Sequence, residues 1–279
     1  RELAMLRTPI WVATPKTALG LKLDTRGLLI LDEFHHAAAK TYQEISEKAR
    51  FAYHRLGLTG THFRADGKDL LMHSVLSRAV YSRSIPECVA MGRLVEAKAA
   101  LVRTTGEDGG KKVPDQEYRN KIIGWCAAEL ARRGKRVLVL CSEVRHVEAI
   151  AELIPGAVGV DGRDTKKGKV RAALDDLEAR RIPCVVGTSV IGEGVDVPAA
   201  DAMVYAAGNR SKVKVIQDVF RILTASAGKS HGVLIDLADN HDEKSVRRAA
   251  ERLHYYRANG FEATPIDTDQ IRGWLDTVC

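Results

Sequence analysis

Two acidic side chains follow directly after an apolar run, and their position suits the chemistry of metal-bound phosphates. Residues 28–31 are four consecutive apolar residues, and Asp32 and Glu33 come next. Such a run is typical of a buried parallel strand, whose carboxyl end is where α/β folds bind ligands. A carboxylate there can hold Mg²⁺, and a second one can orient and deprotonate an attacking water. The pattern therefore indicates a magnesium–nucleotide site with Asp32 as metal ligand and Glu33 as base.

Structural and chemical alternatives compete with this interpretation. An aspartate after a strand often caps the next helix, so the segment by itself supports a cap and a catalyst about equally. His35 and His36 offer zinc ligands, but zinc sites on a helix space their imidazoles four residues apart. Ser142 and His146 have that spacing, which helix faces often show, and no oxyanion loop is identifiable. Metal hydrolysis and nucleophilic catalysis are therefore minor alternatives.

Length and composition predict a two-domain protein in a reducing compartment. The chain has 279 residues, of which 45% are hydrophobic, and a net charge of +7 that is spread along it. This length exceeds a usual single domain, and the charge supports a nucleic-acid partner only weakly. The five cysteines show no CxxC spacing, and Cys141 and Cys184 lie in apolar, strand-like runs. No apolar window is long enough to cross a membrane, so we expect a cytoplasmic protein without membrane contact.

The elements that must position the acids predict α/β architecture in both halves of the chain. In the first half we expect strands at 10–14, 27–31 and 53–61 and a helix over 37–52. In the second half, helices at 118–133, 143–154, 166–181 and 243–256 alternate with strands at 136–141, 183–188, 202–206 and 232–237. This alternation predicts a parallel sheet with helices on both faces.

A polar, glycine-rich stretch predicts the boundary between two domains. Residues 104–112 contain three glycines and no apolar side chain, as exposed linkers do. We therefore expect a first domain at 1–105, a linker at 106–112 and a second domain at 113–279. Aromatic residues in the second domain could stack on bases, but aromatics at helical spacing more often fill a core, and we assign them there. They are Trp125, Trp274, Tyr255 and Tyr256.

Four further segments stand out beside residues 32–35. Residues 12–17 read V-A-T-P-K-T, 58–67 read L-T-G-T-H-F-R-A-D-G, 187–198 read G-T-S-V-I-G-E-G-V-D-V-P, and 217–224 read Q-D-V-F-R-I-L-T. The glycines at 192 and 194 let the backbone turn sharply, while Thr188 can donate to a nucleic-acid backbone and Asp196 can accept from a ribose. A plain turn explains these glycines but not the combination of Thr188 with Asp196.

Together with residues 32–35, these segments resemble superfamily 2 helicases, the DEAD/DExH group, and most closely the restriction-enzyme-like and repair translocases. Residues 32–35 match motif II, 12–17 motif Ib, 58–67 motif III, 137–142 motif IV, 187–198 motif V and 217–224 motif VI. The resemblance implies two RecA-like α/β lobes with the first lobe incomplete, ATP and Mg²⁺ as cofactors, and DNA as a partner, with RNA less favoured.

The resemblance also implies a role for each matching residue. Catalytic roles fall on Asp32, Glu33, His35, Gln217 and Arg221, and nucleotide contacts on Asp32, Gly194, Asp196 and Arg221, with Asp32 as the Mg²⁺ ligand. Thr59 and Thr61 would couple the lobes. Thr14, Lys16, Thr17, Ser142 and Thr188 would hold nucleic acid. Departures from the pattern are Gly60, His62 and Thr224, the last of which replaces a second arginine.

The sequence contains no phosphate-binding loop. No G-x-x-x-x-G-K-[ST] occurs, and the similar triplet 228–230 precedes a predicted strand instead of following one. We therefore interpret 228–230 as an ordinary loop and expect that the chain follows a missing phosphate-loop segment or pairs with a second chain that carries it. The chain alone is expected to bind ATP poorly. Two alternatives are a passive DNA-binding pair of lobes and a motor subunit of a restriction or repair complex.

Overall fold

The computed structural model describes residues 10–37, 39–60, 75–76, 79–104, 116–164, 168–188, 191, 200–208 and 212–279. The chain divides into two compact units, residues 1–82 and 83–279. Each unit has its own hydrophobic core, so we describe each by itself.

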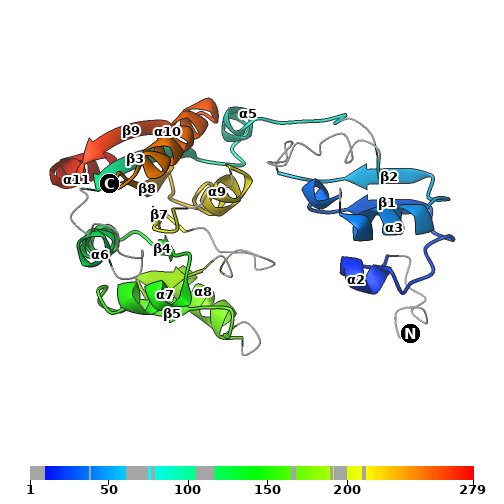
Figure 1. The fold of residues 1–279 in the computed structure, drawn as a ribbon, viewed down its shortest axis with the longest axis horizontal. Coiled ribbons are helices and arrows are strands. Elements are labelled where there is room, and N and C mark those ends of the chain that lie inside the picture. Colours follow the sequence, from blue (N-terminus) through cyan, green and yellow to red (C-terminus); the bar gives the residue numbers. More distant parts are fainter. Residues whose placement is uncertain are drawn as a thin grey trace. The chain divides into compact units, whose positions relative to one another are not determined.

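Unit 1 contains a two-stranded parallel sheet with short helices beside it (Figure 1). Strand β1 is Leu28–Leu31 and strand β2 is His54–Gly57, and Leu28 pairs with His54 in the register. The remaining elements are α2 (Pro15–Ala18), the 3₁₀ turn η1 (Phe34–His36) and α3 (Lys40–Lys48). The predicted strand at 27–31 and helix at 37–52 are therefore confirmed, with shorter bounds.

The core of unit 1 lies between the sheet and α3. Leu31 and Phe34 pack there against Ile45 of α3. Successive side chains of a strand point to opposite faces, and Leu28 and Ile30 are accordingly about half exposed. A β-carbon on Gly57 would lie 2.5 Å from the Phe34 ring, so only glycine lets β2 pass this close to Phe34.

The predicted strand at 10–14 is wrong. Residues 10–14 belong to neither a helix nor a strand, and α2 begins at Pro15. Thr14 caps this helix, because its hydroxyl oxygen accepts a hydrogen bond from the Thr17 amide at 3.3 Å. A proline at the first helical position has the backbone angle that a helix needs and lacks an amide that would go unpaired. The cap and the proline together account for a helix start here.

Unit 2 contains a seven-stranded sheet in the order β5-β6-β4-β7-β8-β3-β9, with every pair of neighbours parallel. The fold class predicted from the sequence is confirmed. The strands are β3 (Glu96–Thr104), β4 (Val137–Leu140), β5 (Val158–Val160), β6 (Cys184–Gly187), β7 (Ala202–Tyr205), β8 (His231–Asp239) and β9 (Glu262–Asp267). The helices are α5 (Ile85–Ala90), α6 (Glu117–Arg132), α7 (Val144–Ala151), α8 (Lys169–Glu178), α9 (Lys212–Val219), α10 (Glu243–Ala258) and α11 (Ile271–Val278), with 3₁₀ turns η6 (Phe220–Ile222) and η7 (Thr268–Gln270).

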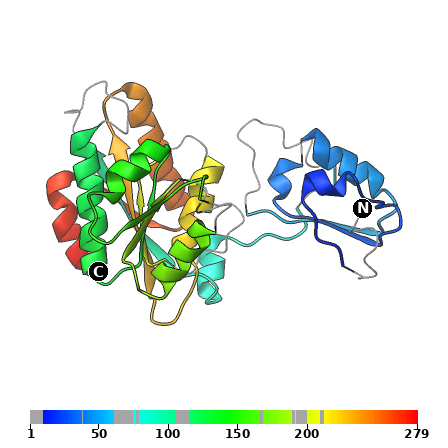
Figure 2. The same ribbon diagram turned by 90° about the horizontal axis from the view of Figure 1, so that it is seen from below.

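Helices cover both faces of this sheet (Figure 2). In β4, Leu138 packs with α8, α9 and α10, while Val137 and Val139 pack with α6, α7 and α11. Every residue of β4, β6 and β7 is buried, as expected for central strands of a parallel sheet. Among the described residues no helix is long and apolar enough to cross a membrane.

A buried ion pair joins α10 to the middle of this sheet. The guanidinium of Arg252 donates to both carboxylate oxygens of Asp236 on β8, at 2.6 and 3.1 Å, and the Tyr256 hydroxyl donates to the same carboxylate at 3.0 Å. Asp236 is fully buried. Because every charged group here has a partner, the pair holds α10 on the sheet in one register.

A second ion pair lies at the carboxyl edge of the sheet. Arg119 on α6 donates to Asp239, the last residue of β8, at 2.7 Å, and to the Ala206 carbonyl after β7 at 2.9 Å. Nearby, His146 Nε2 lies 3.0 Å from the Asn120 side-chain oxygen. Burial, with help from the charge of Arg119, lowers the pKa of His146 to about 4. His146 is therefore neutral at ordinary pH and belongs to the packing of this edge.

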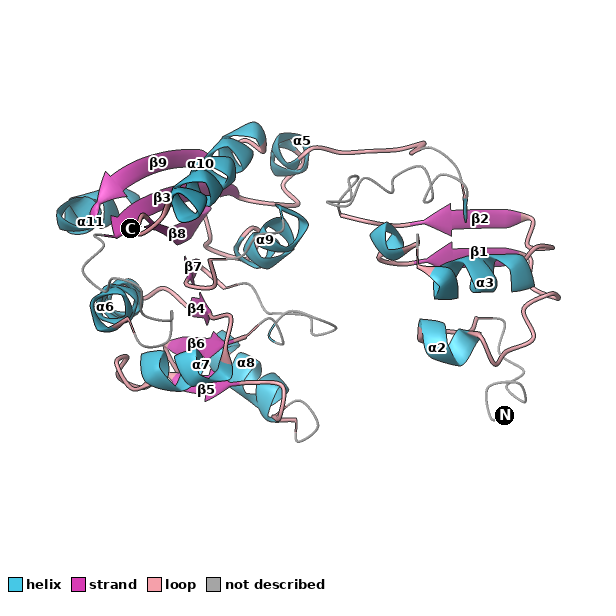
Figure 3. Cartoon of the chain, in the orientation of Figure 1, coloured by secondary structure: helices cyan, strands magenta, loops and turns pink. Residues whose placement is uncertain are grey.

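The structure divides the chain earlier than the sequence predicts. Strand β3 lies inside the predicted first domain (1–105), yet it pairs with β8 on one side and β9 on the other (Figure 3). Unit 2 therefore begins at Arg83, and the predicted linker at 106–112 lies outside the described residues. A polar stretch between β3 and α6 has the composition of a linker, although both flanking elements belong to one sheet domain.

Candidate functional site

The acids predicted to act on a nucleotide lie at the carboxyl end of β1 in unit 1. The Asp32 carboxylate is exposed, and one of its oxygens accepts a hydrogen bond from the Glu33 amide at 2.9 Å. An exposed carboxylate at the end of a parallel strand has the donor chemistry that Mg²⁺ prefers. Asp32 therefore fits the predicted metal role, and η1, which follows it, has no side-chain cap.

Glu33 has an uncommon backbone conformation. Its φ is +49° and its ψ is +47°, the left-handed region that glycine adopts freely and other residues adopt at a cost of about 1 kcal/mol. The backbone is held there because the Phe34 amide donates to the Leu58 carbonyl at 2.8 Å, which ties the turn after β1 to the end of β2. Strained residues of this kind are often found at functional sites.

The strain at Glu33 leads to a testable prediction. The variants Glu33→Gly and Glu33→Ala both remove the carboxylate, but only glycine fits the left-handed conformation without strain. We expect Glu33→Gly to be more stable than Glu33→Ala by about 1 kcal/mol, measured by urea unfolding of the full chain. Equal stabilities, or a more stable alanine variant, would show that the turn relaxes.

His35 joins motif II to motif III. Its Nδ1 lies 3.2 Å from the Thr59 hydroxyl and 3.1 Å from a carboxylate oxygen of Glu33. His35 is buried, so its ring is held in place between the two segments. Nearby, burial raises the pKa of Tyr42, and the charges of Glu33 and Asp32 raise it further, so its phenol stays neutral beside the acids. The structure thus brings Glu33, His35 and Thr59 together, whereas Thr61 lies outside the described residues.

The predicted nucleic-acid residues of unit 1 are all exposed. Thr14, Lys16 and Thr17 lie at the start of α2. The Thr14 hydroxyl lies 2.9 Å from that of Thr17, in addition to accepting the capping hydrogen bond. The capping role explains Thr14 structurally, while the amine of Lys16 has no structural partner among the described residues.

In unit 2, Ser142 and Thr188 both lie at the carboxyl edge of the sheet. They follow the neighbouring strands β4 and β6, whose ends are joined by a hydrogen bond from the Cys141 amide to the Gly187 carbonyl at 2.8 Å. A β-carbon on Gly187 would lie 2.2 Å from the Ile191 side chain, so glycine is needed for the chain to pack after β6. Ser142 is exposed and Thr188 partly exposed, so both hydroxyls can reach a ligand. Gly194 and Asp196 lie outside the described residues.

The motif VI residues occupy α9 and the turn that follows it. Gln217 lies on α9 and Arg221 on η6, and both are partly buried. Gly232 of β8 sets the position of this turn, because a β-carbon there would lie 2.3 Å from the Ile222 carbonyl oxygen. The Val95 amide also donates to the Leu223 carbonyl at 2.8 Å, which ties the turn to the start of β3.

The segment 228–230 forms a loop before β8, as interpreted from the sequence. The Lys229 amine donates to the Ala200 carbonyl at 2.5 Å and to the Thr224 carbonyl at 3.2 Å. Burial lowers the pKa of Lys229 to about 8. This lysine therefore connects the segment after motif V to the end of motif VI, a role that was not predicted because no local pattern marks it.

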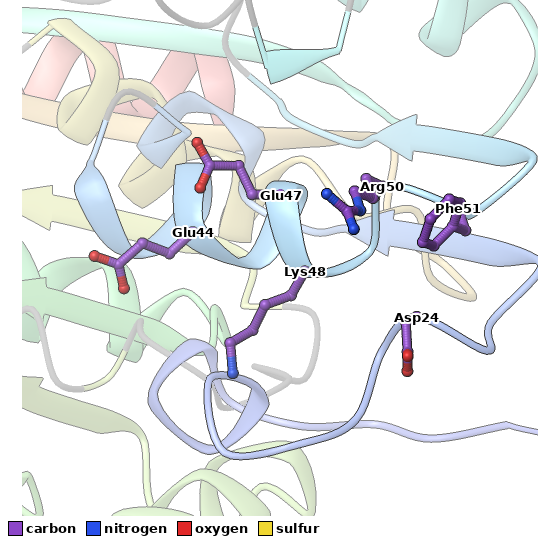
Figure 4. Close-up of a pocket in the computed structure, with 6 residues that line it drawn as sticks. All are labelled: Asp24, Glu44, Glu47, Lys48, Arg50 and Phe51. Atoms are coloured by element: carbon purple, nitrogen blue, oxygen red, sulfur yellow. The ribbon is translucent and has the colours of Figure 1, made fainter.

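A surface hollow in unit 1 lies apart from the motif residues. It has a volume of about 480 Å³ and is lined by residues of α3, by Arg50 and Phe51 after it, and by Asp24 (Figure 4). Glu44 and Lys48 project from α3, and the Arg50 guanidinium lies 4.9 Å from the centre of the Phe51 ring. No residue predicted from the motifs lines this hollow. Among the described residues, no group of three histidine, cysteine or acidic side chains could hold a metal ion.

Two family models match the chain. Residues 10–64 match the family "Type III restriction enzyme, res subunit", and residues 120–225 match "Helicase conserved C-terminal domain". The first match contains motifs Ib, II and the start of III, and the second contains motifs IV to VI. The matched regions thus agree with the motif positions assigned from the sequence.

The individual proteins to which the chain is similar are named as helicases or as restriction-enzyme subunits. A Schizosaccharomyces pombe protein named as the mitochondrial ATP-dependent helicase irc3 is 27% identical over 76% of the chain, which spans 38% of that protein. The ATP-dependent DNA helicase uvsW of phage T4 is 24% identical over 85% of the chain, which spans 51% of it. A fragment assigned as an HsdR subunit of a type I restriction enzyme from Vibrio vulnificus shares the fold, with a TM-score of 0.67 and 18% identity over 91% of this chain and 51% of that one. The chain thus spans about half or less of the length of these proteins.

Proposed function

This chain belongs to the superfamily 2 helicases, and we propose that it forms part of an ATP-dependent motor that moves on or remodels DNA. The observation that carries the proposal is the arrangement at the end of β1. There the exposed Glu33 carboxylate and the Thr59 hydroxyl, which follows β2, both lie within hydrogen-bond distance of His35 Nδ1. DNA is favoured over RNA because the phage T4 relative is named a DNA helicase.

In unit 1, the acidic pair would act on the nucleotide. Asp32 would hold the Mg²⁺ ion that accompanies ATP, and this ion would neutralise charge on the phosphates. Glu33 would orient the attacking water and accept its proton. The His35 imidazole contacts both the Glu33 carboxylate and the Thr59 hydroxyl. A movement of Glu33 that follows a change at the phosphates would therefore be transmitted to motif III.

In unit 2, one pair of residues would contact a nucleotide and a second pair would contact DNA. Gln217 and Arg221 would act on a nucleotide, with the guanidinium stabilising charge that develops on the transferred phosphate. Ser142 and Thr188 would hold phosphates of the DNA backbone, which positions the strand without reading its sequence. Gly194, Asp196 and Thr61 enter this proposal through the family resemblance.

We further propose that the phosphate-binding loop comes from a polypeptide segment other than these 279 residues, in the same protein or in a second chain. Lys229, the lysine of the triplet 228–230, donates hydrogen bonds to two backbone carbonyls, so it does not replace the lysine of a phosphate-binding loop. Such a loop supplies backbone amides and a lysine for the β- and γ-phosphates, and without it ATP should bind weakly.

The second candidate is a passive DNA-binding module. Thr224, at the place of the second motif VI arginine, favours this alternative, because arginines there stabilise the transition state. A passive module would still use Ser142 and Thr188 but would not respond to nucleotide.

Nucleotide-dependent DNA affinity separates the two candidates. Labelled single-stranded DNA would be titrated with the chain together with a phosphate-loop segment, fused or added, in the presence of a non-hydrolysable ATP analogue or of ADP. A motor should change its dissociation constant by about tenfold between the two nucleotides. An affinity that is the same with both nucleotides, while the added segment is folded and bound, would contradict the motor and leave the passive module.

A further inference from the structure

Trp125 does not fill the core, contrary to the assignment made from the sequence. Its side chain lies on α6 and is 36% exposed, whereas Trp274 packs against the core beneath α11. Trp125 lines a groove of about 370 Å³ between α6 and the segment η7–α11, which lie beside each other in Figure 2. Ile122 and Ile271 also line this groove, so an indole and two aliphatic side chains provide an apolar surface.

Basic side chains border the same groove. Lys121 on α6 and Arg272 on α11 both line it and are both exposed. The Arg272 guanidinium lies 5.8 Å from the centre of the Trp125 ring, and neither cation forms an ion pair with a described residue. Asp269 is the acidic side chain in the lining, so the groove retains an excess of positive charge. An aromatic face with cations beside it suits a flat ring that carries a phosphate.

The groove lies at the same edge of the sheet as Ser142 and Thr188. Thr268 of the groove directly follows β9, and α6 begins beside the carboxyl end of β8, where Arg119 binds Asp239. The Tyr118 hydroxyl lies 3.5 Å from that of Thr268, which closes the groove at this edge. Strands β4 and β9 are four neighbours apart in the sheet order. At about 4.8 Å per strand, this is roughly 19 Å along the edge.

We infer that this groove binds a base of the single-stranded nucleic acid whose backbone contacts Ser142 and Thr188. The base stacks on Trp125, and its flanking phosphates lie near Lys121 and Arg272. A nucleic-acid strand with one nucleotide at Ser142 would reach the groove about six nucleotides further on, at the rise of stacked DNA. The inference rests on the proposed function, because that function places the strand on this edge.

Oligonucleotide length provides the test. The full chain would be titrated with single-stranded oligothymidylates of about four and about sixteen nucleotides, the range of small single-strand sites. In a variant with Trp11→Phe and Trp274→Phe, Trp125 is the remaining tryptophan, and we expect the longer oligomer alone to quench its fluorescence. Trp125→Ala should weaken the longer oligomer about tenfold and leave the shorter one unchanged. Trp125→Phe, which keeps an aromatic face, should retain most of the affinity.

Two controls make the outcomes distinct. An abasic oligomer of the longer length keeps the phosphates but has no base to stack, so its affinity should not respond to Trp125→Ala. Thr188→Ala should weaken both lengths of oligothymidylate.

If Thr188→Ala weakens binding while Trp125→Ala does not, the groove inference is wrong and the proposed function stands. If neither variant weakens binding, the nucleic-acid role of this edge is wrong as well. Quenching by an acidic peptide and not by the oligomers would make the groove a protein-docking site and overturn the inference.

Discussion

Glu33→Gln is expected to lower DNA-stimulated ATP hydrolysis by about 100-fold or more when a phosphate-binding loop is supplied. Glutamine has nearly the shape of glutamate and can still contact His35, but it cannot accept a proton from water. The exposed position of the Glu33 side chain at the end of β1 gives water access to the carboxylate. Nucleotide affinity should change little, because Asp32, and not Glu33, is proposed to hold the metal ion.

A matched control isolates this effect from a general change of charge. Glu44 lies on α3 of the same unit, is partly exposed and faces Lys40 at 3.8 Å. Glu44→Gln removes the same charge away from the end of β1 and should leave hydrolysis unchanged. Single-turnover hydrolysis and nucleotide binding would be measured for both variants. Hydrolysis by Glu33→Gln within a few-fold of the unmodified chain would rule out Glu33 as the base.

Asp236→Ala is expected to lower the free energy of unfolding of unit 2 by about 3–5 kcal/mol. The change removes the carboxylate that pairs with Arg252, whose side chain is 8% exposed, and leaves a cation buried between α10 and β8. It also removes the acceptor of the Tyr256 hydroxyl. The measurement is urea unfolding followed by circular dichroism.

Glu251→Ala is the matched control on the same helix. Glu251 faces Arg247 at 3.9 Å, and both side chains are more than half exposed. Exposed pairs of this kind contribute about 0.5 kcal/mol or less.

The double replacement Asp236→Leu with Arg252→Met should recover much of the loss, because it removes both charges together. A loss below about 1 kcal/mol for Asp236→Ala would show that water reaches the Arg252 guanidinium.

Strong local patterns were sufficient to predict much of this fold. The run at 28–31 forms β1, and the helix predicted to end before Gly134 does so, with that glycine at a φ of +76°. Strands with weak local patterns were missed. β3 contains four alanine or charged residues in its first four positions, and β5 has only three residues, one of them glycine. Their neighbours in the sheet determine these strands, since Ala99 and Ala100 of β3 are fully buried.

Strand β9 was not predicted from the sequence, and its proline shows why. Pro265 argues against a strand, because proline cannot donate to a neighbouring strand. β9 is nevertheless a strand, and it lies at the edge of the sheet, where one side needs no donor. Edge or central position depends on the order of all seven strands, which the sequence does not display.

For the candidate site, the sequence predicted residue types but not geometry. The motif positions located Asp32, Glu33, His35 and Thr59, and the structure brings the last three into contact. The left-handed backbone of Glu33 was not predictable, because it depends on the hydrogen bond from the Phe34 amide to the carbonyl of Leu58, which follows the neighbouring strand β2. Lys229 was equally hidden, since its carbonyl partners are 29 and 5 residues away.

The position of β3 has a practical consequence for anyone who wishes to express the second lobe separately. A fragment that starts after the polar stretch at 106–112 would lack the strand between β8 and β9. β9 would then have no neighbour, and one edge of β8 would expose unpaired backbone N–H and C=O groups to other molecules, a common cause of aggregation. A fragment that starts at Arg83 keeps the whole sheet, so the cut belongs more than twenty residues upstream of the place where composition suggests it.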